Sequence, residues 1–91
     1  MDDRPESVLR NFFTSSGRLH TMPAKRSKRL VVLDHIVQRF EPGETYSEKD
    51  VNKILEGFNA DYASLRRALV DEEFLSRENN VYWRSGGSFE V

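Results

Sequence analysis

The stretch FLSRENNVYWR, residues 74–84, decides the fold of this 91-residue chain. Two runs of bulky residues flank the pair Asn79-Asn80, and asparagine tolerates the positive φ of a tight turn. The stretch therefore predicts a β-hairpin. Because an isolated hairpin is marginally stable in water, we expect Leu75, Val81 and Trp83 to pack back onto the rest of the chain. The two strands are expected at residues 74–77 and 81–84.

Upstream of the hairpin, apolar residues recur with helical spacing in three segments. The first begins beside Pro23, a residue favoured at helix starts. In the second, Ser47 with Asp50 three residues later resembles a capping box. The third is capped within residues 59–61. The helices are expected over residues 24–40, 47–57 and about 60–72.

The order of these elements is that of a winged helix-turn-helix. The predicted fold is α+β and mainly α, a three-helix core with a C-terminal β-hairpin wing, preceded by a short extra helix near residues 7–13. Residues 60–72 would form the recognition helix, and Thr45-Tyr46 a third strand. A plain three-helix bundle with a disordered C-terminus is the competing architecture, but it would leave Trp83 in solvent.

Length and charge set further bounds on the chain. Ninety-one residues predict one domain, residues 1–91, with a core at 17–84 and flexible ends at 1–6 and 85–91. The net charge of −1 excludes a uniformly basic nucleic-acid coat, although a local basic patch remains open. Without cysteine, a long apolar run or an apolar leader, the sequence favours a cytoplasmic protein with no membrane partner.

A basic cluster, Lys25, Arg26, Lys28 and Arg29, stands at the start of the first predicted core helix. Cations there oppose the helix dipole, so helix stability does not account for them. Three interpretations remain open. The cluster is a solvated helix end, or it binds phosphate together with Arg18, or it pairs with acidic side chains such as Glu72 and Glu73 or with a partner protein.

The predicted recognition helix and wing supply further basic and polar side chains. Arg67 is the best expected contact to base edges or phosphate, unless Asp71 pairs with it one turn later. Arg66, at the margin of the buried stripe, is expected to pair with a carboxylate. The other side chains expected at DNA are Asn59 and Ser64 in the groove and Arg77 and Arg84 on the wing.

Catalytic chemistry lacks the residues that it needs. His20 and His35 are the only histidines, and they do not stand at metal-ligand spacing. No glycine-rich phosphate loop follows a strand. We therefore expect a non-catalytic domain without a cofactor.

Several blocks of the sequence, in register with one another, resemble a bacterial domain family of unknown function. These blocks include LRRALVD at residues 65–71 and YWR at residues 82–84, and the similarity covers roughly residues 17–84. Members of that family occur alone or fused to helix-turn-helix domains of transcriptional regulators. The resemblance implies a winged-helix-like fold and a link to transcription regulation, and it brings no established catalytic residue or ligand.

Two functions follow as hypotheses. The first is a DNA-binding module in transcription regulation. The second is a protein-interaction or homodimerisation module on the same scaffold. Its contact surface would be the acidic residues Glu48, Asp50 and Glu56, or the paired rings of Phe12-Phe13, which would be a liability if exposed.

Overall fold

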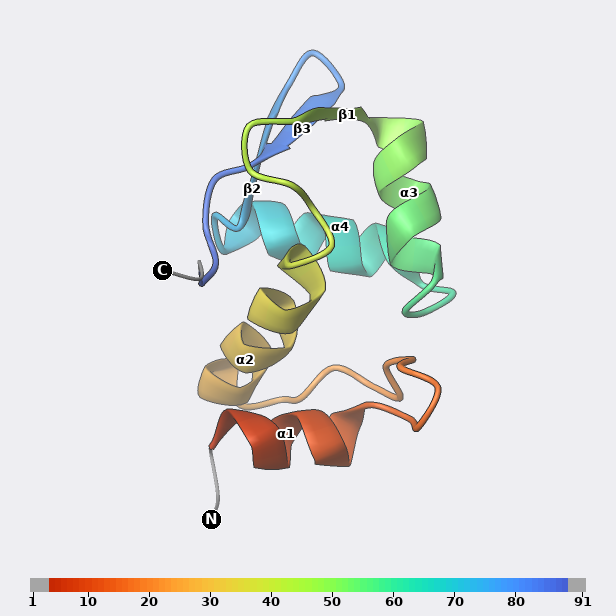
Figure 1. Cartoon of the computed structure of the whole chain (residues 1–91), viewed down its shortest axis with the longest axis vertical. Helices are drawn as coiled ribbons and strands as arrows, with labels where there is room; N and C mark the ends of the chain where they lie inside the picture. The colour runs from red at the N-terminus through yellow and green to blue at the C-terminus, as the bar shows by residue number, and fades with distance from the viewer. Residues whose placement is uncertain (1–3, 89–91) are drawn as a thin grey trace.

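The computed structural model describes residues 4–88, and within this range the chain is α+β and mainly helical, as predicted (Figure 1). Helix α1 lies across one end of α2, while α3 and α4 pack between α2 and a small sheet at the opposite end of the molecule. The elements are α1 (Pro5–Phe12), α2 (Arg26–Val37), β1 (Thr45–Ser47), α3 (Glu48–Glu56), α4 (Tyr62–Asp71), β2 (Leu75–Glu78) and β3 (Val81–Arg84).

Helix α1 begins at Pro5, two residues earlier than expected, because proline suits the first helical position. Residues 1–3 of the expected flexible end lie outside the described range. The paired rings at the end of α1 are half-buried and pack against the core, so they are not the exposed pair that would be a liability. The ring of Phe13 packs edge to face against the rings of His35 and Phe58. The distances between ring centroids are 4.9 Å to His35 and 6.3 Å to Phe58.

Helix α2 starts at Arg26 and not at residue 24, because Lys25 keeps an extended backbone as its N-cap (φ −74°, ψ 128°). Pro23 therefore lies before the helix and not at its first position. A continuous buried stripe runs along α2 and through the turn that follows it, and no apolar residue of that stripe is exposed by more than 1%. It consists of Val32, Leu33, Ile36, Val37 and Phe40.

Helices α3 and α4 are both capped by side chains, as their sequences predict. The Ser47 hydroxyl accepts a hydrogen bond from the backbone N–H of Asp50 at 3.1 Å. The Asp61 carboxylate accepts one from the backbone N–H of Ser64 at 3.3 Å. Residues 57–61 join the two helices in a short connection.

The three strands form an antiparallel sheet in the order β1-β3-β2. Asn79 and Asn80 make the turn of the β2–β3 hairpin with φ of 51° and 63°, which confirms the predicted hairpin. Thr45-Tyr46 lies in the third strand, as predicted.

The sheet faces the helices with the opposite side of β3 from the one expected. In the register, Leu75 lies opposite Arg84, and Tyr82 is fully buried. Because neighbours along a strand point to opposite faces, Val81 and Trp83 lie on the outer face. Val81 is 40% exposed and Trp83 is half-buried outside the core. The expectation that these two residues pack onto the helices is therefore wrong, while Leu75 does so.

Residues 85–88, at the start of the second end expected to be flexible, make defined contacts. The backbone N–H groups of Ser85 and Gly86 donate to the Phe74 carbonyl at 3.0 and 3.1 Å. Ser88 binds Asp34 of α2 through its backbone N–H and its hydroxyl. Residues 89–91 lie outside the described range.

Within residues 4–88, no helix combines the length and the apolar character needed to cross a bilayer.

Candidate nucleic-acid interface

Arg67 lies on the outward face of α4. At about 3.6 residues per turn, it projects almost opposite the buried line of Leu65 and Leu69. Its side chain is exposed, and within residues 4–88 its guanidinium has no hydrogen bond or ion pair, so the considered pairing with Asp71 does not form there. Arg67 is therefore available to an external anion.

The other two polar residues predicted for the groove, Asn59 and Ser64, differ in their contacts within the chain. Asn59 donates through Nδ2 to the Leu19 carbonyl at 2.9 Å and accepts through Oδ1 from the Asp61 backbone N–H at 2.8 Å. Both ends of its amide thus hold the chain together, and the groove role predicted for Asn59 would compete with these two hydrogen bonds. Ser64 is exposed in the first turn of α4.

Side chains of the basic cluster have partners within the molecule. Arg26 donates two hydrogen bonds to the Glu72 carboxylate, from Nη2 at 2.8 Å and from Nε at 3.2 Å. This hydrogen bonding lowers the pKa of Glu72 below its usual value, and the nearby positive charges of Arg26 and Arg29 add to the effect. Of the three interpretations of the cluster, pairing with an acid holds for Arg26.

The remaining members of the cluster surround the start of α2. Arg29 donates to the Ala24 carbonyl, and Lys25 and Lys28 have partners of their own. Lys25 is exposed, and Lys28 and Arg29 are half-buried. Their charges add a positive field beside α4.

Arg18 holds the carboxyl end of α3. Its Nη1 donates to the Glu56 and Gly57 carbonyls, each at 3.2 Å. A cation there satisfies carbonyls that the helix leaves unpaired and complements the negative end of the helix dipole. Arg18 therefore caps α3, a role that the sequence did not predict, and its phosphate contact stays a prediction.

The two arginines predicted on the hairpin also differ. Arg84 is only 9% exposed, and it donates to the carbonyls of Phe40 at 3.2 Å, Gly86 at 2.9 Å and Ser88 at 2.6 Å. A buried fork that binds three carbonyls cannot reach DNA, so the prediction for Arg84 is wrong. Arg77 is exposed on β2 and has no hydrogen bond or ion pair within the described part of the chain.

A polar network that the sequence does not reveal joins α3, α4 and β3. The Tyr82 hydroxyl donates to the Glu48 carboxylate at 2.8 Å, and Arg66 Nε lies 3.8 Å from the same oxygen. Arg66 also donates to Asn52. Burial, and then the hydrogen bond to Glu48, raise the pKa of Tyr82 above its usual value. The carboxylate pairing predicted for Arg66 is confirmed.

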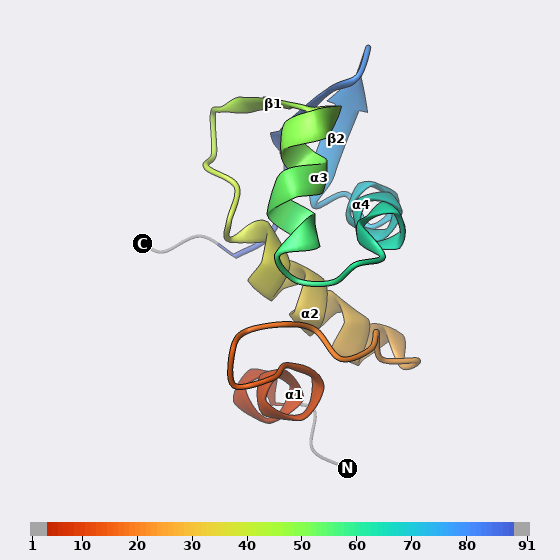
Figure 2. The ribbon, with the colours of Figure 1, turned by 90° about the vertical axis from the view of Figure 1, so that its right-hand side faces the viewer.

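The exposed arginines Arg67 and Arg77 and the basic cluster, whose members have partners within the chain, come from three elements. Figure 2 shows α4 nearly end-on, with β2 above it and the first turn of α2 below it. Arg67 lies on α4, Arg77 on β2, and the basic cluster at the start of α2.

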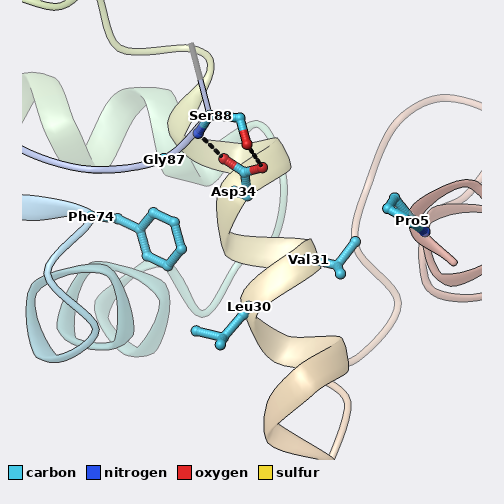
Figure 3. A pocket seen from close by; sticks show the side chains of 7 residues that line it. All are labelled: Pro5, Leu30, Val31, Asp34, Phe74, Gly87 and Ser88. Atoms are coloured by element: carbon cyan, nitrogen blue, oxygen red, sulfur yellow. Dashed lines mark hydrogen bonds between the residues drawn. The ribbon is translucent and has the colours of Figure 1, made fainter. Parts of the chain in front are cut away.

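Two of the hollows in the described structure lie beside the helices. One, of about 360 Å³, lies between α1, α2 and the loops at residues 74 and 87–88 (Figure 3). Its walls are mostly apolar, and both oxygens of its one carboxylate, Asp34, accept hydrogen bonds from Ser88 at 2.6 and 2.7 Å. The other, of about 470 Å³, opens beside α4.

Metal-binding groups do not gather in the described structure. Within residues 4–88, no set of three histidine, aspartate or glutamate side chains is placed to share a metal ion.

Comparison with known proteins gives one match. Neither the curated proteins nor the solved structures include a match to this chain. The model of a family described as "Uncharacterized protein conserved in bacteria (DUF2087)" matches residues 18–84. These residues coincide with the region in which the sequence resembles a bacterial family of unknown function. The chain therefore belongs to the bacterial DUF2087 family.

Proposed function

We propose that this chain is a non-catalytic winged-helix domain that binds duplex DNA in transcription regulation, with α4 in the major groove. The arrangement α2, β1, α3, α4, β2, β3 with the strand order β1-β3-β2 carries the proposal, because it presents a helix-turn-helix beside a hairpin. The hairpin then serves as the wing.

Arg67 would be the central contact. In a helix-turn-helix, the outward side chains of the second helix contact base edges and phosphates. Arg67 is exposed and opposite the buried stripe, and arginine is the residue that most often binds guanine. Ser64, one turn earlier, would contact the same groove.

Phosphate contacts would come from the flanks of α4. Arg77, on the wing, would contact phosphates on one side of α4. The phosphates on the other side would be contacted by Lys25, Lys28 and Arg29. The acidic residues Asp61 and Asp71 on α4 oppose this attraction. We therefore expect weak autonomous binding, within the range of about 10⁻⁴ to 10⁻⁶ M typical of non-specific complexes.

Fluorescence anisotropy with a random duplex tests the proposal. About three phosphate contacts would lower the affinity about 40-fold between about 50 and 200 mM salt. Arg67→Ala should weaken binding by about tenfold. The matched control is Arg10→Ala, which removes the same charge from an exposed position on α1 and should change affinity less than about twofold. Equal binding by the Arg67→Ala variant and the wild type would refute the role of α4.

The alternative, a protein-interaction module on the same scaffold, is favoured by the outer face of the sheet. Val81 and Trp83 share that face, and the chain carries no net positive charge. Sedimentation equilibrium separates the alternatives for a homodimer. A mass that rises with concentration in the wild type, and not in Val81→Lys, would support association through the sheet.

A further inference from the structure

The hollow beside α4 lies against the first two turns of that helix. Residues 19–22, on the way from α1 to α2, run beside this helix and enclose about 470 Å³ with it. That volume falls within the range of small-molecule sites. We call it the α4 hollow. Its floor is Met22, Leu65 and Ala68, and its rim includes His20, Asp61 and Ser64.

The floor of the α4 hollow is apolar. Leu65 is 4% exposed, and Met22 and Ala68 are half-buried and pack against the core. The three side chains together form an apolar surface. Such a surface suits an aromatic ring, whose burial there would remove apolar area from water.

The rim of the α4 hollow is polar and can accept hydrogen bonds. Asp61 uses Oδ1 to cap α4, so its second oxygen is left for a ligand. Within residues 4–88, the His20 ring and the Ser64 hydroxyl have no hydrogen-bond partner. Asn59, by contrast, already uses both ends of its amide. Asp61 is the one carboxylate in the lining, so the rim is negative.

We propose that the α4 hollow binds a small arylalkylamine, with the ring on the floor and the ammonium group at Asp61. A charge-assisted hydrogen bond to the free carboxylate oxygen would orient the ligand. Ser64 belongs both to this hollow and to the proposed DNA face, so the ligand would sit at the edge of that face. The site itself does not depend on DNA binding and can be tested without DNA.

Tyramine is the probe, titrated into ¹⁵N-labelled protein at about pH 7.5, where its amine is protonated. We expect saturable amide shifts at Thr21, Met22, Asp61 to Leu65 and Ala68. Asp61→Asn should weaken binding by about tenfold or more, because it removes the charge. Asparagine caps helices as well as aspartate does, so the fold should be retained.

Two controls separate this site from general attraction to an acidic surface. Asp71→Asn removes a charge from an exposed position later in the same helix and should leave the tyramine affinity within about twofold of the wild-type value. The acid 3-(4-hydroxyphenyl)propionate carries the same ring with the opposite charge and should not bind. Absence of saturable shifts, equal affinity in Asp61→Asn, or equal binding of the acid would each overturn the proposal.

Discussion

Arg84 is the residue on which the C-terminal part of the structure depends. Its guanidinium joins the carbonyls of Phe40, Gly86 and Ser88, so it links the end of the α2 stripe to the chain beyond β3. Replacement by methionine keeps the stem but removes the side-chain donor from the Phe40 and Gly86 carbonyls, while the Ser88 carbonyl keeps its hydrogen bond from Gln38. We expect Arg84→Met to lower the free energy of unfolding by about 2–3 kcal/mol in urea denaturation. A loss below about 0.5 kcal/mol, typical of a surface position, would contradict the structural role.

Tyr82 couples stability to alkaline pH. Its pKa is raised in the folded protein by burial and by the hydrogen bond to Glu48. Folding therefore favours the protonated phenol. This contribution is fully present below the ordinary tyrosine pKa of about 10 and is lost as the pH rises above it.

The matched variant is Tyr82→Phe, which fills the same buried space without the hydroxyl. It should lose about 0.5–1.5 kcal/mol of unfolding free energy near neutral pH. Its unfolding free energy should also fall less steeply than that of the wild type between about pH 9 and 11. Parallel pH profiles for the two proteins would show that Tyr82 does not carry the alkaline dependence.

The side chains of β3 show what the sequence alone could not decide. Alternate residues of β3 share a face, and each of the two faces carries one large aromatic ring. One face has Val81 and Trp83 and the other has Tyr82 and Arg84, so the alternation alone does not show which face is buried. The choice depends on pairing with β1 and β2 and on the Phe40 carbonyl, 44 residues away. The pattern predicted the strand, but the face required contacts that are distant in the sequence.

At the scale of the element, the hairpin turn depends on two residues with positive φ. Such a conformation costs most side chains about 1–2 kcal/mol, and asparagine less. We expect Asn80→Val to lower the free energy of unfolding by about 1–2 kcal/mol, measured in urea. Asn80→Gly should lie within about 0.5 kcal/mol of the wild type, because glycine is preferred at this position. Equal losses in both variants would indicate a role for the asparagine side chain itself.

The helix caps and the links between helices differ in how well the sequence predicts them. Ser47 and Asp61 cap helices through groups three residues away, so local spacing revealed both. The Arg26–Glu72 pair spans 46 residues, and Arg18 reaches the end of α3 across 38 residues. Pairing of the basic cluster with Glu72 was one of three predictions, and only the fold brings these two groups together.

At the scale of the whole molecule, the helical core, the hairpin and the third strand follow from periodicity and turn chemistry. The proposed site is predicted less well from the sequence. Three of the residues expected at DNA bind backbone carbonyls of the chain itself: Asn59, Arg84 and Arg18. Arg67 on α4 and Arg77 on β2 are both exposed, as expected from the sequence. The proposed DNA face is thus narrower than the sequence predicted and is centred on α4.

The most direct test of this account is an amide chemical-shift footprint of a random duplex on the ¹⁵N-labelled protein at low salt. The account predicts perturbations centred on Ser64 and Arg67 in α4, with weaker ones at Arg77 and at the start of α2, all reversed by added salt. Perturbations confined to the outer face of the sheet around Val81 and Trp83, or none at millimolar duplex, would contradict it.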